Sequence, residues 1–151
     1  DLYGTDAVRF ALVAGTAPGN DPAISEEKIK GYRNFANKIW NASRFVLMNL
    51  DPLSPPPIHK GKGRVMVKLN ADDKKILKKL ETTAKKITRH LDHFEFHLAG
   101  ETIYHYFWHT FADKIIEAMK PRLGIPSPQS SSLGKGQSED DRRAAQYILY
   151  T

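Results

Sequence analysis

The sequence predicts an all-α protein, an up-down bundle of helices whose last helix is truncated. Apolar residues recur every three or four positions in several stretches, and a residue that can cap a helix precedes each long stretch. The segments between these stretches are rich in proline, glycine and serine, which favour turns. Of the 151 residues, 40% are apolar and 26% are charged, a balance typical of one soluble globular domain with a single core.

The first helix is expected from Asp6 to about Ala14. Thr5 is expected to be its N-cap, and Gly15 follows the last helical residue. The helix is apolar on nearly all sides, so other elements should cover several of its faces. Residues 16–24 form a turn-rich linker that leads to the next helix.

The first long helix should begin after Ser25 and run to about Leu50, before Pro52. Ser25 is a good N-cap, and Glu26 and Glu27 suit the positive end of a helix. At about 100° per residue, one side of this helix is apolar. That side consists of Tyr32, Phe35, Ala36, Ile39, Ala42, Val46 and Leu50.

The opposite side of this helix carries three asparagines and three cations without a carboxylate. We call it the asparagine stripe, which consists of Lys30, Arg33, Asn34, Asn37, Asn41 and Arg44. Asparagine is a mediocre helix former, so its repeated use indicates that its paired donor and acceptor are needed. Two structural alternatives stand beside this interpretation. The asparagines could bond neighbouring helices or loops, and the arginines could pair with carboxylates elsewhere in the fold.

Residues 51–70 are expected to form a loop, because they hold four prolines, with a short extended piece at residues 65–68. Asn70 then caps the second long helix, and Asp73 completes a capping box. The apolar side of this helix consists of Ile76, Leu77, Leu80, Ala84, Ile87 and Leu91.

The second long helix also concentrates the positive charge. Residues 74–89 carry seven lysine or arginine side chains against Glu81, and the net charge of the whole chain is +6. A basic helix face indicates a polyanionic partner, and its alternative is a lysine face that only water solvates. We call four of these cations the lysine face, which consists of Lys74, Lys78, Lys85 and Arg89.

A third long helix is expected from about Leu98 to Lys120, after a break around residues 93–97. Its apolar face is wide enough to pack between two other helices. This face consists of Ile103, Tyr104, Phe107, Trp108, Phe111, Ile115 and Met119. The residues expected to end the helix are Pro121, Gly124, Pro126 and Pro128.

The last helix should begin after Ser138, with Asp141 three residues on. Its apolar periodicity continues to the end of the chain, and residues 126–137 before it are typical of a mobile linker. Because the chain begins with Asp1 rather than methionine, both ends look cut, and we expect a piece of a longer protein.

Several classes of chemistry are not expected from this sequence. The chain has no cysteine, so it has no disulfide and no thiolate site. Gly61 and Gly63 match no phosphate-binding loop, and no serine lies in a nucleophile elbow. Nothing at the start resembles a signal peptide, and no apolar run is long enough to span a membrane.

Histidines offer a metal site as an alternative. Glu101, His105 and His109 are spaced by one helical turn, which can place three ligands on one face. A second group consists of His90, His93 and His97. The first group borders the apolar face, where histidines more often mark the edge of packing. Without cysteines or a His-Glu-x-x-His motif, we expect no metal.

Three segments carry a resemblance to a known family. Residues 32–41, Tyr-Arg-Asn-Phe-Ala-Asn-Lys-Ile-Trp-Asn, together with residues 5–10 and 107–120, resemble the class Ia aminoacyl-tRNA synthetases for valine, isoleucine and leucine. The resemblance is closest to valyl-tRNA synthetases. Lys75 departs from it, since the family often has an aromatic residue near the start of this helix.

The resemblance implies a domain plan and partners. Residues 1–22 would be the edge of the catalytic domain with a linker, and residues 23–151 an anticodon-binding helical bundle, incomplete at its C-terminus. The first helix would seal the junction to the catalytic domain of the same chain and should lie partly uncovered in this piece. The partner would be the anticodon stem-loop of tRNA, without membrane contact, in a cytoplasmic protein that is a monomer.

The resemblance also implies an active site outside this chain. The class I signatures His-Ile-Gly-His and Lys-Met-Ser-Lys-Ser are absent, so the chain should be inactive alone and hold no cofactor. The parent enzyme would join valine to tRNA with ATP and Mg. Anticodon recognition uses unpaired bases, which amides, arginines and aromatic rings bind. The asparagine stripe would contact these bases, and the lysine face would contact phosphates.

Two alternatives stay open for the function. One is the anticodon-binding domain of an isoleucyl-tRNA synthetase. The other is a helical module that binds a protein through the aromatic face of residues 103–119.

Overall fold

Helices account for all regular secondary structure in the described residues of the computed structural model, which are 2–14, 16, 19–21, 24–50, 67–125 and 138–151. In chain order they are α1 (Thr5–Val13), α2 (Glu26–Asn49), α3 (Ala71–Asp92), α4 (Phe96–His105), η1 (Tyr106–Ile116), α5 (Glu117–Arg122) and α6 (Glu139–Tyr150). The all-α class is confirmed. In these residues, no helix is both long and apolar enough to cross a bilayer. Most of the expected loop at 51–70 and the linker at 126–137 lie outside the described residues.

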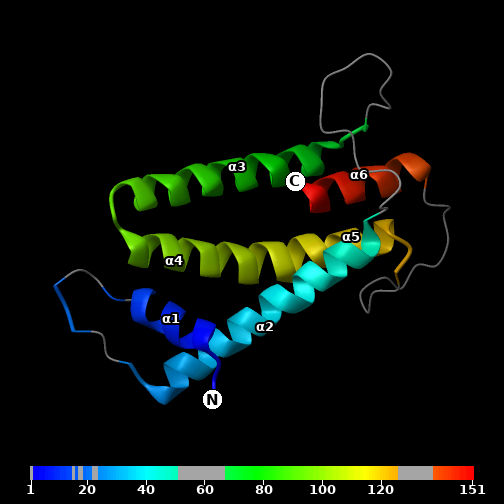
Figure 1. Cartoon of the computed structure of the whole chain (residues 1–151). Helices are drawn as coiled ribbons and strands as arrows, with labels where there is room; N and C mark the ends of the chain where they lie inside the picture. Colours follow the sequence, from blue (N-terminus) through cyan, green and yellow to red (C-terminus); the bar gives the residue numbers. More distant parts are fainter. Residues whose placement is uncertain (1, 15, 17–18, 22–23, 51–66, 126–137) are drawn as a thin grey trace.

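One continuous helical rod forms the middle of the bundle, because α4, η1 and α5 follow one another without a break. α3 runs antiparallel to this rod along one side, and α1 and α2 lie along the other (Figure 1). α6 packs beside α5 and the beginning of α3. The end of α3, α1 and the beginning of α2 therefore share one end of the bundle (Figure 1).

Three of the helices have side-chain N-caps at the positions that the sequence predicts. The Ser25 hydroxyl accepts a hydrogen bond from the backbone N–H of Lys28 (3.1 Å), and Ser138 accepts one from Asp141 (3.2 Å). Asn70 and Asp73 form the predicted capping box, with N···O distances of 2.8 and 3.1 Å. Such caps satisfy N–H groups that have no partner within the helix.

The start of α1 differs from the prediction. Thr5 is the first helical residue, and the N-cap position belongs to Gly4, which provides no side-chain hydrogen bond. Gly4 has a φ of +81°, a conformation that glycine adopts at little cost. The expected cap at Thr5 is therefore wrong.

α1 packs through its alanines and leaves larger apolar side chains uncovered. Its buried side includes Ala7 and Ala11, and the exposed apolar residues are Val8, Leu12 and Val13. Gly100 of α4 permits this close packing, because a Cβ added there would lie 3.3 Å from the Cβ of Ala14. The expectation that this helix is partly uncovered is confirmed.

The rod is longer than the predicted helix, since it runs from Phe96 to Arg122. Pro121 lies inside its last turn, so the prediction that Pro121 ends the helix is wrong. Proline lacks an N–H and costs a helix one hydrogen bond, but only one helical residue follows Pro121 here. The chain leaves the helix at Gly124, as expected, with a φ of +80°.

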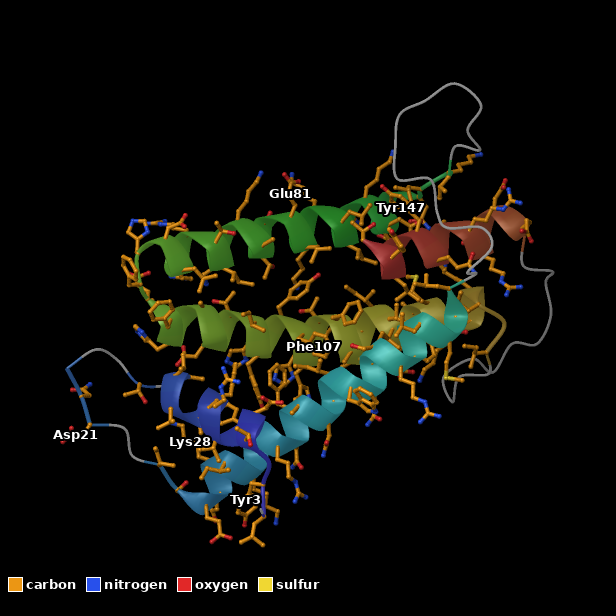
Figure 2. All side chains as sticks on the ribbon, in the orientation of Figure 1. Tyr3, Asp21, Lys28, Glu81, Phe107 and Tyr147 are labelled. Carbon is orange, nitrogen blue, oxygen red and sulfur yellow. The ribbon has the colours of Figure 1, made fainter. Side chains whose placement is uncertain are left out.

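An aromatic cluster joins α1, α2 and the rod. Phe35 of α2 is buried, and four rings surround it at centroid distances of 4.8–6.2 Å. These rings belong to Phe10, Tyr104, Phe107 and Trp108. Figure 2 shows Phe107 between the rod and α2. Phe107 and Trp108 belong to η1, a π-helix, which the apolar pattern did not predict.

A second, aliphatic cluster joins α2, the rod and α6. It consists of Ala42, Ile115, Ile116, Met119, Ala145, Ile148 and Leu149. Partly buried side chains of α2, α3 and η1 pack against it. The bundle is thus held by an aromatic cluster at the α1 end and an aliphatic cluster at the α6 end.

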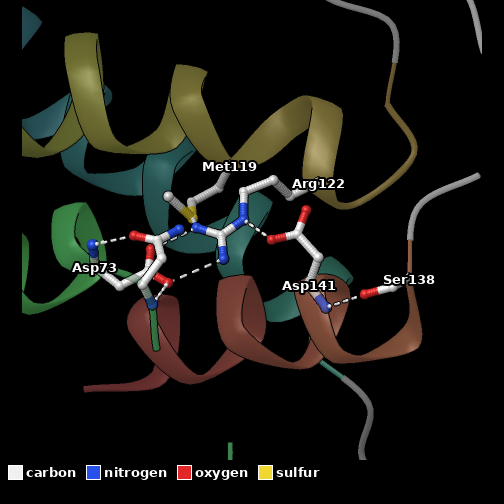
Figure 3. A network of polar contacts seen from close by, with 6 residues as sticks. Asp73, Met119, Arg122, Ser138 and Asp141 are labelled. Carbon is white, nitrogen blue, oxygen red and sulfur yellow. Dashed lines mark hydrogen bonds and ion pairs between the residues drawn. The ribbon is translucent and has the colours of Figure 1, made fainter. Parts of the chain in front are cut away.

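Arg122 connects three helix ends through one guanidinium group (Figure 3). Its Nη1 and Nη2 donate to the two carboxylate oxygens of Asp73 (2.6 and 3.2 Å), and its Nε donates to Asp141 (2.8 Å). Asp73 begins α3 and is 1% exposed, while Asp141 begins α6. Burial acts to lower the pKa of Arg122, but the hydrogen bonds and charges of Asp73 and Asp141 raise it overall.

Candidate nucleic-acid interface

The asparagine stripe lies on the side of α2 that faces away from the rod. All six of its residues are exposed, whereas Phe35 and Ala42 on the opposite side are buried. Within the described residues, the side chains of Asn34, Asn37 and Asn41 form no hydrogen bond. The alternative that these asparagines bond neighbouring helices therefore finds no support in this part of the chain.

Arg33 contacts the N-terminal segment rather than a carboxylate. Its Nη1 donates to the Leu2 carbonyl (3.4 Å), and its guanidinium lies 6.0 Å from the centre of the Tyr3 ring. The Tyr3 hydroxyl donates to Glu26, and this hydrogen bond raises the pKa of Tyr3. Among the residues that the structure describes, neither Arg33 nor Arg44 pairs with a carboxylate. The guanidinium of Arg44 is thus open to a partner.

Lys38, which the sequence pattern did not single out, does pair with a carboxylate. Its Nζ lies 2.7 Å from Oδ1 of Asp113 and 5.3 Å from the centre of the Trp108 ring. These contacts fasten α2 to η1. The sequence pattern could not predict this pair, because the partner of Lys38 is 75 residues away.

Trp40 is a candidate that the sequence reasoning missed. Its side chain is 70% exposed, and on the helix surface it lies beside Asn37 and Arg44. An exposed indole offers a plane on which an unpaired base can stack. A signal was available, since at 100° per residue Trp40 falls outside the apolar side of the helix.

The lysine face is exposed on the side of α3 that points away from the rod. Figure 2 shows Glu81 on this outward side. Lys85 pairs with Glu81 (2.6 Å), and this hydrogen bond lowers the pKa of Glu81. In the described part of the chain, Lys74, Lys78 and Arg89 form no ion pair. Three of the four cations are therefore not held in an ion pair by the described residues.

The structure does not bring the asparagine stripe and the lysine face together. α2 and α3 lie on opposite sides of the rod, and each face points away from it (Figure 1). An RNA that contacts both faces has to cross an end of the bundle, either where α3 ends and α2 begins or where α3 begins and α2 ends (Figure 1).

His105 and His109, considered for the metal alternative, make contacts within the rod. The rings of His105 and His109 stack with centroids 5.7 Å apart, and His109 lies 3.8 Å from Asp113. Across the described ranges, no group of three or more histidine, cysteine or acidic side chains can hold a metal ion. The metal alternative finds no support there.

Similarity to known proteins decides the family. The family described as "Anticodon-binding domain of tRNA ligase" matches residues 73–151, more than half of the chain. The chain belongs to this family. The matched part of this anticodon-binding domain contains nearly all of α3, the rod and α6.

Valine–tRNA ligases are among the relatives of this anticodon-binding domain. The valine–tRNA ligase of Aquifex aeolicus is 38% identical over 150 residues, which cover 99% of this chain and 12% of the relative. Those of Clostridium tetani and Thermotoga maritima are 43% and 42% identical over 123 residues, which cover 82% of the chain. The chain thus spans 12–13% of the length of these relatives. No solved structure matches the chain.

Proposed function

We propose that this chain is the anticodon-binding domain of a valine–tRNA ligase and binds the anticodon stem-loop of the tRNA. The observation that carries the proposal is the asparagine stripe, which is fully exposed, lacks carboxylates and lies beside the exposed ring of Trp40. Amides can pair with base edges, arginines can stack on or bond to bases, and the indole can stack. Family membership supports tRNA as the partner.

The rest of the enzyme supplies the reaction under this proposal. A catalytic domain in the same protein joins valine to tRNA with ATP and Mg, in the cytoplasm and as a monomer. Residues 1–22 form the edge of that domain with a linker, and residues 23–151 form the RNA-binding bundle. The uncovered apolar side of α1, at Val8, Leu12 and Val13, suits a junction between domains.

The two alternative functions have less support. The relatives named above are valine–tRNA ligases rather than isoleucine ligases. The aromatic face of residues 103–119 packs inside the bundle, and its members are buried or half-buried. It is therefore not available to a protein partner.

The test compares stem-loop RNAs that differ only in their anticodon. Binding of the 151-residue chain is measured by fluorescence anisotropy. Asn37→Ala and Asn41→Ala should each reduce the preference for the valine anticodon, because each removes an amide that pairs with a base edge. Ser43→Ala, at an exposed polar position of α2 outside the stripe, is the matched control and should change nothing. No measurable binding by the wild-type chain would contradict the proposal.

A further inference from the structure

We infer that the turn between α3 and α4 is a second site for unpaired RNA bases, with Phe94 and Phe96 as its stacking surface. The inference rests on the proposed function, because it names a further contact for the same RNA. The turn lies at the end of the bundle that α3 shares with the beginning of α2, so one RNA lying across that end can reach it (Figure 1).

Phe94 and Phe96 are aromatic rings that the core does not enclose. Phe94 is 76% exposed and Phe96 is 49% exposed. Their ring centroids are 6.1 Å apart with the planes at 79°, which is an edge-to-face pair. Each ring therefore keeps apolar surface open to solvent, and a base can stack on it.

The backbone of Phe94 adopts a conformation that favours glycine, with a φ of +58°. The Phe94 N–H donates to the carbonyl of Leu91 (3.0 Å), and the Glu95 N–H donates to that of His90 (2.8 Å). These are the two hydrogen bonds of a Schellman motif, in which glycine usually occupies the position of Phe94.

The same motif ends the rod, where the position of Phe94 is taken by Gly124. The Gly124 N–H donates to Pro121 (3.1 Å), and the Ile125 N–H donates to Lys120 (2.9 Å). The chain thus places glycine in one of two equivalent turns and a strained phenylalanine in the other. Burial does not offset the strain at Phe94, and strained residues cluster at functional sites.

Charge around the turn favours RNA over a protein partner. Arg89 and His93 are exposed beside the rings. The carboxylate of Glu95 is paired with His90 (2.6 Å) and Lys85 is paired with Glu81 (2.6 Å), which leaves Lys86 and Arg89 as exposed cations and Asp92 as the exposed acid. Aromatic rings beside a positively charged helix end are typical of surfaces that bind single-stranded nucleic acid.

The experiment titrates the 151-residue chain into an anticodon stem-loop RNA with 2-aminopurine at one loop position. The fluorescence of this base falls when it stacks, and a separate end label reports affinity. Thermal unfolding of each protein is followed by circular dichroism. The variants are Phe94→Gly and Phe96→Ala. Tyr150→Ala, which truncates an exposed aromatic side chain of α6 at the other end of the bundle, is the control.

Phe94→Gly should bind the stem-loop at least about fivefold more weakly, because one base–aromatic stack contributes that much or more. It should also reduce the quenching of 2-aminopurine and raise the melting temperature, since glycine relieves the strained backbone. Phe96→Ala should weaken binding by a similar factor. Tyr150→Ala should bind as the wild type does.

Unchanged affinity in both phenylalanine variants, with binding retained by the wild type, would overturn the inference and leave the proposed function intact. A lower melting temperature of Phe94→Gly with unchanged affinity would also overturn it, because Phe94 would then be structural. Failure of the wild-type chain to bind the stem-loop would contradict the proposed function itself.

Discussion

At the scale of single residues, Arg122 stabilises the bundle by satisfying a buried carboxylate. Asp73 is almost fully buried, and its two oxygens accept hydrogen bonds from Arg122 while one also accepts from Asn70. A buried charge that loses its partner is strongly destabilising. Arg122 is therefore essential for the stability of the bundle as long as Asp73 is present.

Arg122→Met should lower the free energy of unfolding by about 3–5 kcal/mol, because it leaves the Asp73 carboxylate buried and unpaired. Adding Asp73→Asn should recover part of this loss, since the amide carries no charge and still accepts from Asn70. Urea unfolding of the wild type, the single variant and the double variant measures both effects. A double variant that is less stable than Arg122→Met would contradict this explanation.

Phe35 and Trp40 lie five residues apart on α2. Their substitutions should have opposite effects: the first should lower stability, and the second should weaken RNA binding. Phe35→Ala should lower the free energy of unfolding by about 3–5 kcal/mol, because it leaves a cavity among four rings. Trp40→Ala should change stability by no more than about 0.5 kcal/mol, since the ring is exposed, yet it should weaken RNA binding. Urea unfolding and anisotropy measure the two quantities. Equal destabilisation by both variants would contradict the assignment of Trp40 to the surface.

Contacts between residues that are close in the sequence could be predicted, and contacts between residues that are far apart in the sequence could not. The caps at Ser25, Asn70 and Ser138 each bond a residue three positions on, so the pattern itself contains both partners. Arg122 bonds a residue 49 positions away, and Lys38 one 75 positions away. No local pattern encodes such pairs.

At the scale of helices, periodicity predicts the elements better than their ends or their internal form. α2 and α3 begin where their caps are and end within a residue or two of the predicted places. The π-helical geometry of η1 escaped prediction, because a wide apolar face suits an α-helix and a π-helix alike. The end of the rod was misplaced because proline is tolerated within its last turn.

The pairing of His90 with Glu95 should make the α3–α4 turn sensitive to acid. The hydrogen bond from His90 lowers the pKa of Glu95 below its ordinary value of 4.5. A lowered pKa in the folded state means that charged Glu95 stabilises the fold above the unfolded value, and that this contribution is lost as the pH falls through the folded value.

Glu95→Gln should therefore be less stable than the wild type at about pH 5–6, and the difference should shrink as the pH falls below 4.5. Thermal unfolding across this pH series measures the difference. Glu101→Gln, an exposed position on α4 outside the turn, serves as the control and should show no such trend. A difference between Glu95→Gln and the wild type that grows toward low pH would contradict the stated linkage.

At the scale of the whole molecule, the positions of the two candidate faces constrain how RNA can bind. The fold class and the exposure of both faces could be predicted from the amphipathic patterns of α2 and α3, because the polar side of such a helix faces solvent. Their placement on opposite sides of the rod could not, since it depends on how the helices pack (Figure 1). RNA that lies across the shared end of the bundle meets the end of α3 before its beginning.

If the α3–α4 turn binds RNA as inferred above, charge removal should matter most near this turn. The double variant Lys85→Gln with Arg89→Gln should flatten the log–log dependence of affinity on salt, by about 0.7–0.9 for each lost phosphate contact. Lys74→Gln, on the same face but in the first turn of α3, is the matched control and should leave the slope nearly unchanged. Anisotropy titrations at several salt concentrations give the slopes. An equal effect of Lys74→Gln would place the RNA along the whole of α3 instead.

The measurement that tests the central claim most directly compares the wild-type chain on two stem-loop RNAs across a salt series. One RNA carries the valine anticodon, and the other carries an unrelated anticodon on the same stem. We predict tighter binding of the valine stem-loop, with an affinity for both that falls as salt rises. Equal affinity for the two RNAs, or an affinity that salt does not change, would contradict the account.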